Sequence, residues 1–163
     1  MNAFVIDTFE FGRKKERAEG ELAVADFARL RDEVAFDTGT VQWALQGGMH
    51  ASGHPQVQLS VKAEVKLMCQ RCLTPFAFAI DSATVLVLVG SEEAADELED
   101  QLADEDVDVI AGSKSMDVLE LVEDEVLLAV PLSPKHEQCL DQRGPEAETT
   151  VRVSPFDVLK NKQ

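Results

Sequence analysis

The clearest pattern along the chain is a strict alternation of apolar and polar side chains between residues 57 and 67. The apolar positions are Val57, Leu59, Val61, Ala63, Val65 and Leu67. A period of two predicts a β-strand with one dry and one wet face. A shorter alternation over 41–46 predicts a second strand. A third is predicted over 76–89, where a nearly all-apolar end indicates burial on both faces.

A helix is predicted from Asp117 to about Val130, where apolar positions recur three and four residues apart. Asp117, followed three residues later by Glu120, forms a capping box, and Pro131 ends the helix because it removes a donor. Its apolar face is expected to include Val118, Leu121, Val122, Leu128 and Ala129. The acidic residues 123–125 are expected to face water.

The N-terminal half carries weaker signals. Alternation over residues 4–8 predicts a short strand, and apolar positions three and four apart predict a short helix over 25–34. Gly47 and Gly48, with the segment 52–55, predict a turn before the long strand. Together these elements predict an α+β fold, an antiparallel β-sheet or open barrel with a few packed helices and an acidic loop.

That acidic loop covers residues 91–108, which contain ten Asp and Glu residues and no Lys or Arg. Like charges repel and tend to remain solvated, so we expect a mobile loop rather than a frayed helix. The chain from 133 onward is polar except for an apolar stretch over 151–159 that could dock on the sheet. We therefore expect one domain over 1–163, with a loose tail over about 140–163.

Composition limits the possible partners. The chain has 163 residues, 45% of them hydrophobic, and a formal charge of −16. This acidity disfavours broad non-specific binding to RNA or DNA and attracts basic partners, although it can also serve solubility alone. No apolar run approaches the roughly 20 residues of a membrane span, and the start lacks the apolar stretch of a signal peptide, so a cytoplasmic protein is expected.

Cys69 and Cys72 lie between two predicted strands, at the tip of an expected hairpin, which is a usual place for half of a zinc site. His136 and Cys139 would complete a Cys₃His site if the end of the acidic helix returns to the hairpin. Four protein ligands would make the zinc structural. Free thiols are the alternative; a redox pair is disfavoured because such pairs usually open a helix. Leu73 stands where tight zinc turns often carry glycine.

Arrangements typical of catalysis are weak in this sequence. His50 and His54 lie in a Gly-rich turn and are expected to be solvated. Ser82 and Ser133 lack the context of a nucleophile elbow. We therefore expect a protein that is not an enzyme.

Three motifs, in order, resemble the YceD family, the large ribosomal RNA subunit accumulation proteins. The block VKLMCQRCLTPF at 65–76 is similar to the family's Cys-x-Arg-Cys signature. The segment MDVLELVEDEVLLAVP at 116–131 is similar to its second hallmark, and His136 and Cys139 follow it as in proteobacterial members. The segment SPFDVL at 154–159 resembles the family's tail.

The resemblance implies a role in accumulation or processing of the 23S ribosomal RNA precursor and in biogenesis of the large ribosomal subunit. The expected partner is that precursor, through its ribosomal RNA or a basic ribosomal protein. Arg71, Lys62, Lys66 and Leu73 are the candidate contacts beside the hairpin, although the two lysines can equally be the wet face of a strand. The alternatives are a metal-assisted ribonuclease and an acidic chaperone for a basic ribosomal protein.

Overall fold

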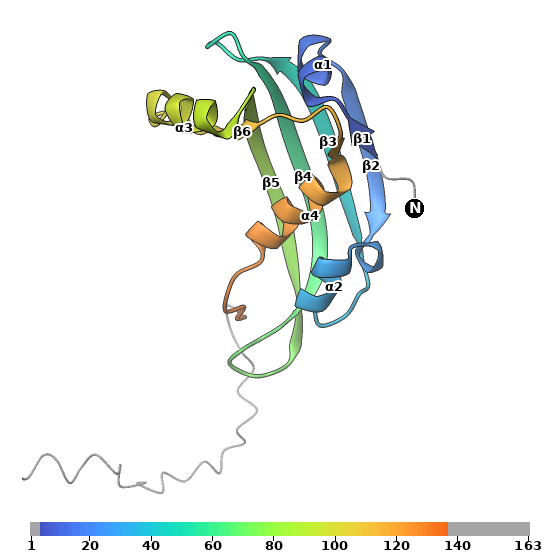
Figure 1. Ribbon diagram of the computed structural model, residues 1–163. Helices are drawn as coiled ribbons and strands as arrows, with labels where there is room; N and C mark the ends of the chain where they lie inside the picture. The colour runs from blue at the N-terminus through green and yellow to red at the C-terminus, as the bar shows by residue number, and fades with distance from the viewer. Residues whose placement is uncertain (1–3, 137–163) are drawn as a thin grey trace, which may run out of the picture.

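The computed structural model describes residues 4–136, and its centre is a five-stranded sheet in the order β2-β3-β4-β5-β6 (Figure 1). The strands are β2 (Arg17–Ala23), β3 (Thr40–Met49), β4 (Pro55–Met68), β5 (Pro75–Val89) and β6 (Asp108–Ala111). Neighbouring strands are antiparallel except β5 and β6, which are parallel. The predicted α+β class is confirmed, with an open, mixed sheet.

Helices and a small second sheet complete the described part of the chain. In the small sheet, β1 (Val5–Ile6) pairs with β7 (Met116–Asp117). The helices are α1 (Thr8–Arg13), the 3₁₀ helix η1 (Val24–Asp26), α2 (Ala28–Glu33), α3 (Glu92–Gln101) and α4 (Val118–Ala129). The predicted helix over 25–34 thus divides into η1 and α2, and the predicted strand over 4–8 shortens to β1.

The alternation over 57–67 places one face of β4 in the main core, as predicted. Helix α4 lies across this face, over β4 and β5 (Figure 1). Its residues Val118, Val122 and Val126 are fully buried and belong to the same core cluster. Their spacing of four residues keeps them on one side of the helix, so a single stripe attaches α4 to the sheet.

The predicted limits of α4 are confirmed. The Asp117 side chain caps the helix by accepting a hydrogen bond from the Leu119 N–H at 2.9 Å, and the helix ends just before Pro131. Two side chains were predicted on the wrong face. Leu128 is 82% exposed because it lies two residues, about 200°, around the helix from buried Val126. Glu123 is only 7% exposed because it faces α2, where a partner meets its charge.

The predicted acidic loop is wrong for residues 92–101, which form α3. The Ser91 hydroxyl caps the helix by accepting from the Ala94 N–H at 3.2 Å. Ala95 and Leu98 pack against apolar residues of β5 and β6, on the face of the sheet opposite α4. The packing of Ala95 and Leu98, together with the Ser91 cap, therefore outweighs the repulsion among the acidic side chains of α3, which remain in water.

The glycine pair predicted as a turn lies instead within β3. The hairpin turn comes later, where His50 donates its main-chain N–H to the His54 carbonyl at 2.8 Å. Gly47 is needed because α1 packs there: a Cβ at this position would lie 2.1 Å from the Phe11 carbonyl oxygen. The absence of a side chain serves close approach of two backbones rather than chain reversal.

Candidate metal centre

Cys69 and Cys72 lie in the loop that joins β4 to β5, as the sequence predicts. Two main-chain hydrogen bonds shape this loop, from the Cys69 N–H to the Thr74 carbonyl at 3.0 Å and from the Leu73 N–H to the Cys69 carbonyl at 2.9 Å. Leu73 has a φ of 57°, in the left-handed region that favours glycine. The position after the second cysteine therefore has the backbone of a tight zinc turn, but a leucine occupies it.

The chain after α4 returns to this hairpin. The Gln70 N–H donates to the Pro134 carbonyl at 2.8 Å, and the Arg71 guanidinium donates to the His136 carbonyl at 3.0 Å. The His136 ring lies against Phe76, with ring centroids 4.6 Å apart. These contacts hold the imidazole beside the two cysteines, so the chain after the helix returns to the hairpin, which is the condition that a Cys₃His site requires.

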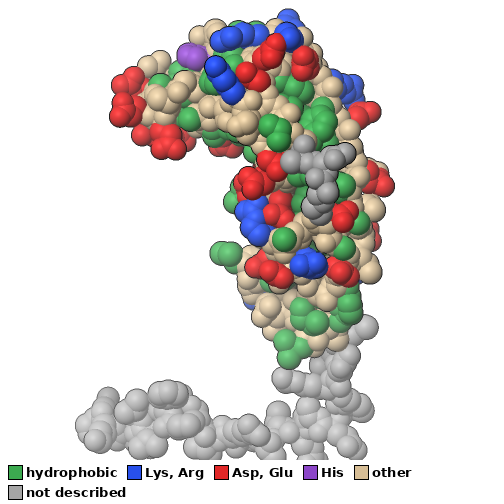
Figure 2. All heavy atoms as spheres, turned by 45° about the vertical axis from the view of Figure 1, so that its right-hand side comes forward, with side chains coloured by type: hydrophobic (Ala, Val, Ile, Leu, Met, Phe, Trp, Pro, Cys, Tyr) green, Lys and Arg blue, Asp and Glu red, His purple; other side chains and the backbone are tan. Residues whose placement is uncertain are grey.

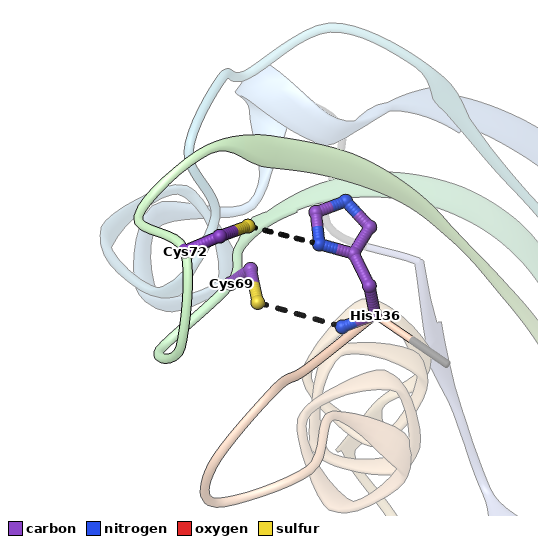
Figure 3. A group of neighbouring side chains, drawn as sticks. All are labelled: Cys69, Cys72 and His136. Carbon is purple, nitrogen blue, oxygen red and sulfur yellow. Dashed lines mark hydrogen bonds between the residues drawn. The ribbon is translucent and has the colours of Figure 1, made fainter. Parts of the chain in front are cut away.

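Cys69, Cys72 and His136 point toward one another (Figure 3), and their candidate ligand atoms all lie within 4.8 Å of each other. Cys72 Sγ is 3.2 Å from His136 Nδ1, and the His136 N–H donates to Cys69 Sγ at 3.5 Å. Around tetrahedral zinc, sulfur and nitrogen ligands stand about 3.5–3.8 Å apart. The three side chains can therefore hold one metal ion after small adjustments.

The electrostatics of Cys69 suit a metal ligand. Its side chain is fully buried, and burial opposes ionisation. Main-chain N–H groups of Cys72, His136 and Arg71 direct hydrogen bonds to its sulfur, and they outweigh burial and lower the pKa of the thiol from 9.0 to about 5. Since the thiolate is the form that binds metal, the loop already favours the binding state near neutral pH.

Cys139, the predicted fourth ligand, lies outside the described residues. It follows His136 by three positions, a stretch that spans at most about 11 Å. Within residues 4–136, the Cys69, Cys72 and His136 group is the only set of three potential ligands close enough to hold one ion.

The other predicted contact residues lie on strand β4 and in the hairpin loop. Lys62 and Lys66 lie on the sheet face opposite α4, with Glu64 between them. Lys62 stands opposite Asp81 of β5 in the strand register. Arg71 is engaged with the chain after α4, whereas Leu73 is 70% exposed at the tip of the hairpin. Arg71 is also exposed, so the surface next to the metal centre carries a guanidinium as well as an apolar side chain.

A second polar cluster was missed by the sequence analysis. His50, predicted as solvated, has a side chain that is only 9% exposed. Its Nε2 lies 2.9 Å from the Glu105 carboxylate and its Nδ1 lies 2.8 Å from the Ser52 hydroxyl, so the β3–β4 turn is joined to the loop before β6. No local signal predicts this, because Glu105 is 55 positions from His50.

A family model described as YceD, large ribosomal RNA subunit accumulation protein, matches residues 57–161. The chain belongs to the YceD family. The matched range begins in β4 and includes the cysteine hairpin, α3 and α4, whereas β2 and β3 precede it. The family name links this chain to accumulation of ribosomal RNA of the large subunit. No solved structure gives a significant match.

No helix within residues 4–136 has both the length and the apolar character needed to cross a membrane.

Proposed function

We propose that this chain is a non-catalytic accessory factor that acts in the cytoplasm in accumulation or processing of 23S ribosomal RNA. The family match over residues 57–161 carries the link to the large ribosomal subunit. The convergence of three metal-ligand side chains inside the matched range gives the proposal its site.

In this proposal the centre holds one structural zinc ion, bound by Cys69, Cys72, His136 and Cys139. The first two ligands come from the β4–β5 hairpin and the other two from the chain after α4. Such an ion would connect segments more than 60 positions apart in sequence and would hold the hairpin tip, with Leu73, in one conformation. A set of four protein ligands leaves no position for an activated water, which supports a role in binding rather than in hydrolysis.

The environment of Glu123 also supports a non-catalytic role. A metal-assisted ribonuclease would need a free general base, and Glu123 is the one buried carboxylate within residues 4–136. It is buried and accepts hydrogen bonds from the Arg29 main-chain N–H at 3.2 Å and from the Arg29 guanidinium at 2.5 Å. A carboxylate held this way is engaged in joining α2 to α4.

A second candidate function is a chaperone for a basic ribosomal protein. Figure 2 shows Asp and Glu side chains gathered over a protruding lobe, and the α3 sequence EEAADELEDQ contains no Lys or Arg. An acidic lobe attracts a basic protein and repels the phosphates of RNA. The two candidates are separated by whether association survives removal of RNA by ribonuclease.

The proposal is tested by depleting the protein from the cells in which it is naturally expressed and measuring the amounts of mature 23S and 16S ribosomal RNA. The proposal predicts a lower ratio of 23S to 16S RNA, restored by the wild-type chain but not by Cys72→Ser. His50→Ala, which alters the polar cluster in the β3–β4 turn, is the matched control and should restore the ratio. An unchanged ratio after depletion would contradict the proposed role.

A further inference from the structure

Strand β2 lies at the edge of the five-stranded sheet, and within residues 4–136 only β3 pairs with it. Its ladder partner is β3, with Arg17 opposite Gln46 and Ala23 opposite Thr40. Just beyond its two ends, Gly47 donates to the Glu16 carbonyl at 2.8 Å and Val24 donates to the Gly39 carbonyl at 3.0 Å. In an antiparallel ladder such hydrogen-bonded pairs recur at every second residue, so the even-numbered residues of β2 bond to β3.

The odd-numbered residues of β2 therefore direct their main-chain groups away from β3. These residues are Arg17, Glu19, Glu21 and Ala23. Within residues 4–136, their outward N–H and C=O groups take no main-chain partner. A row of such groups is a template for pairing with another extended chain.

The two faces of this edge differ in chemistry. Glu19 and Glu21 lie on the face opposite α4, beside a hollow of about 530 Å³ that Gln42, Ser60 and Lys62 also line. The face toward α4 carries Ala18, Gly20 and Leu22. The face opposite α4 also carries Arg17, whose guanidinium contacts the Glu19 carboxylate at 3.1 Å, and the Gln42 amide donates to Glu21 at 2.7 Å. Both carboxylates are exposed and border the hollow, so a basic side chain of a partner can still reach them.

Trp43 provides an independent sign of an incomplete edge. It stands opposite Gly20, and its indole lies so close that a Cβ on Gly20 would be 3.0 Å from Nε1. The ring is 7% exposed, and Nε1 has no hydrogen-bond acceptor within residues 4–136. A buried indole N–H normally finds a partner, and an oxygen brought to the Gly20 edge would provide one.

From this edge we infer that β2 binds an extended peptide in which Lys or Arg alternates with small or apolar residues, as a sixth strand of the sheet. Basic side chains would face Glu19 and Glu21, and the others would lie beside Gly20 and Leu22. A second copy of β2 fits poorly, because antiparallel pairing about Gly20 sets Glu19 opposite the Glu21 of the other copy. The inference goes beyond the proposed function and does not depend on it.

The probe is a short synthetic peptide of alternating Lys and Val, capped at both ends and carrying a fluorescent label. Its matched control has the same composition with the lysines and valines in two blocks. Trp43 is the only tryptophan and the chain has no tyrosine, so intrinsic fluorescence reports on the β2 edge directly. We expect the alternating peptide to bind roughly tenfold more tightly than the block peptide and to shift the Trp43 emission.

Two variants separate backbone pairing from charge. Glu21→Pro removes an outward N–H without touching the bonds to β3, whereas Glu21→Gln removes the charge and keeps the N–H. We expect Glu21→Pro to bind the alternating peptide roughly tenfold more weakly than Glu21→Gln does. Circular dichroism checks that both variants are folded. If Glu21→Pro fails to fold, the double variant Glu19→Lys, Glu21→Lys replaces it and should prefer an alternating Glu–Val peptide.

Equal affinity for the alternating and block peptides would overturn the inference, as would equal affinity of Glu21→Pro and Glu21→Gln. Displacement of the labelled peptide by an oligouridine would assign the surface to RNA and would also overturn it. The ratio of 23S to 16S RNA tests the proposed function separately, because the peptide assay contains no ribosomal component.

Discussion

Arg29 of α2 and Glu123 of α4 form an ion pair in which the carboxylate is buried and the guanidinium is half-exposed, with Nε and Oε1 2.5 Å apart. The same guanidinium contacts the exposed Asp124 at 2.7 Å, and both carboxylates raise the pKa of Arg29. Because the Arg29 main-chain N–H also donates to Glu123, this carboxylate fixes the start of α2 against α4. Of the acidic residues that the sequence pattern predicts on the wet face of α4, Asp124 is exposed, whereas Glu123 is buried in this pair.

Glu123→Gln should lower the melting temperature by roughly 5 °C, because the buried group loses its charge-assisted hydrogen bonds. Asp124→Asn is the matched control. It removes a neighbouring carboxylate that also contacts Arg29 but is exposed, so its melting temperature should stay close to that of the wild type. Thermal unfolding followed by circular dichroism measures both. A larger loss for Asp124→Asn than for Glu123→Gln would contradict this account of the pair.

Leu73→Gly should raise the free energy of unfolding by up to about 1 kcal/mol, because glycine adopts the left-handed φ of 57° without steric cost. Little burial is lost, since the leucine is largely exposed. Lys15→Gly is the matched control, since Lys15 has a φ of 54° in the turn after α1. Urea unfolding should show a similar gain for both variants. A clear loss in Leu73→Gly alone would indicate that the side chain contributes to folding.

Gly47→Ala should lower stability by more than about 2 kcal/mol or prevent folding, because the new Cβ would lie 2.1 Å from the Phe11 carbonyl oxygen. Gly48→Ala is the neighbouring control, where the nearest atoms are those of the flexible Gln56 side chain at 3.5 Å. That substitution should change stability little. Chemical denaturation compares the two, and equal effects would show that α1 does not pack on β3 as described.

The Cys69 thiol predicts a pH dependence in the metal-free protein. Its pKa falls from 9.0 to about 5 on folding, so the folded state favours the thiolate. The stability this contributes is complete above pH 9 and is lost as the pH falls toward 5. With a chelator and a reductant present, the difference in unfolding free energy between wild type and Cys69→Ala should therefore shrink from pH 9 to pH 5. A difference that is constant, or that grows at low pH, would contradict the lowered pKa.

The elements that the sequence predicts well are those with strong local patterns. The alternation over 57–67 predicts β4, and Asp117 with Pro131 predicts the limits of α4. Helix α3 is not predicted because acidic residues make up most of its sequence. The two residues that attach it to the sheet, Ala95 and Leu98, pack only because β5 and β6 lie beside them. Local sequence carries no information on such distant surfaces.

The same limit applies to the functional residues: those with a local spacing signal are predicted, and those that depend on a distant partner are not. The spacing of Cys69 and Cys72 and the position of His136 after a helix predict three of its members. The partners of Glu123 and His50 are 94 and 55 positions away in sequence, so only the tertiary fold brings them together. Where a residue's chemistry depends on a distant neighbour, pattern and spacing do not predict it.

Metal analysis of the full-length protein, purified with a reductant and without added chelator, tests the central proposal most directly. Inductively coupled plasma mass spectrometry should find one zinc ion per chain in the wild type and in His50→Ala. It should find little zinc in Cys72→Ser and in His136→Ala. A chelator should remove the ion from the wild type and thereby make its cysteine thiols reactive. A wild-type protein that stays metal-free after incubation with zinc, with its cysteine thiols reactive, would contradict the proposed zinc centre.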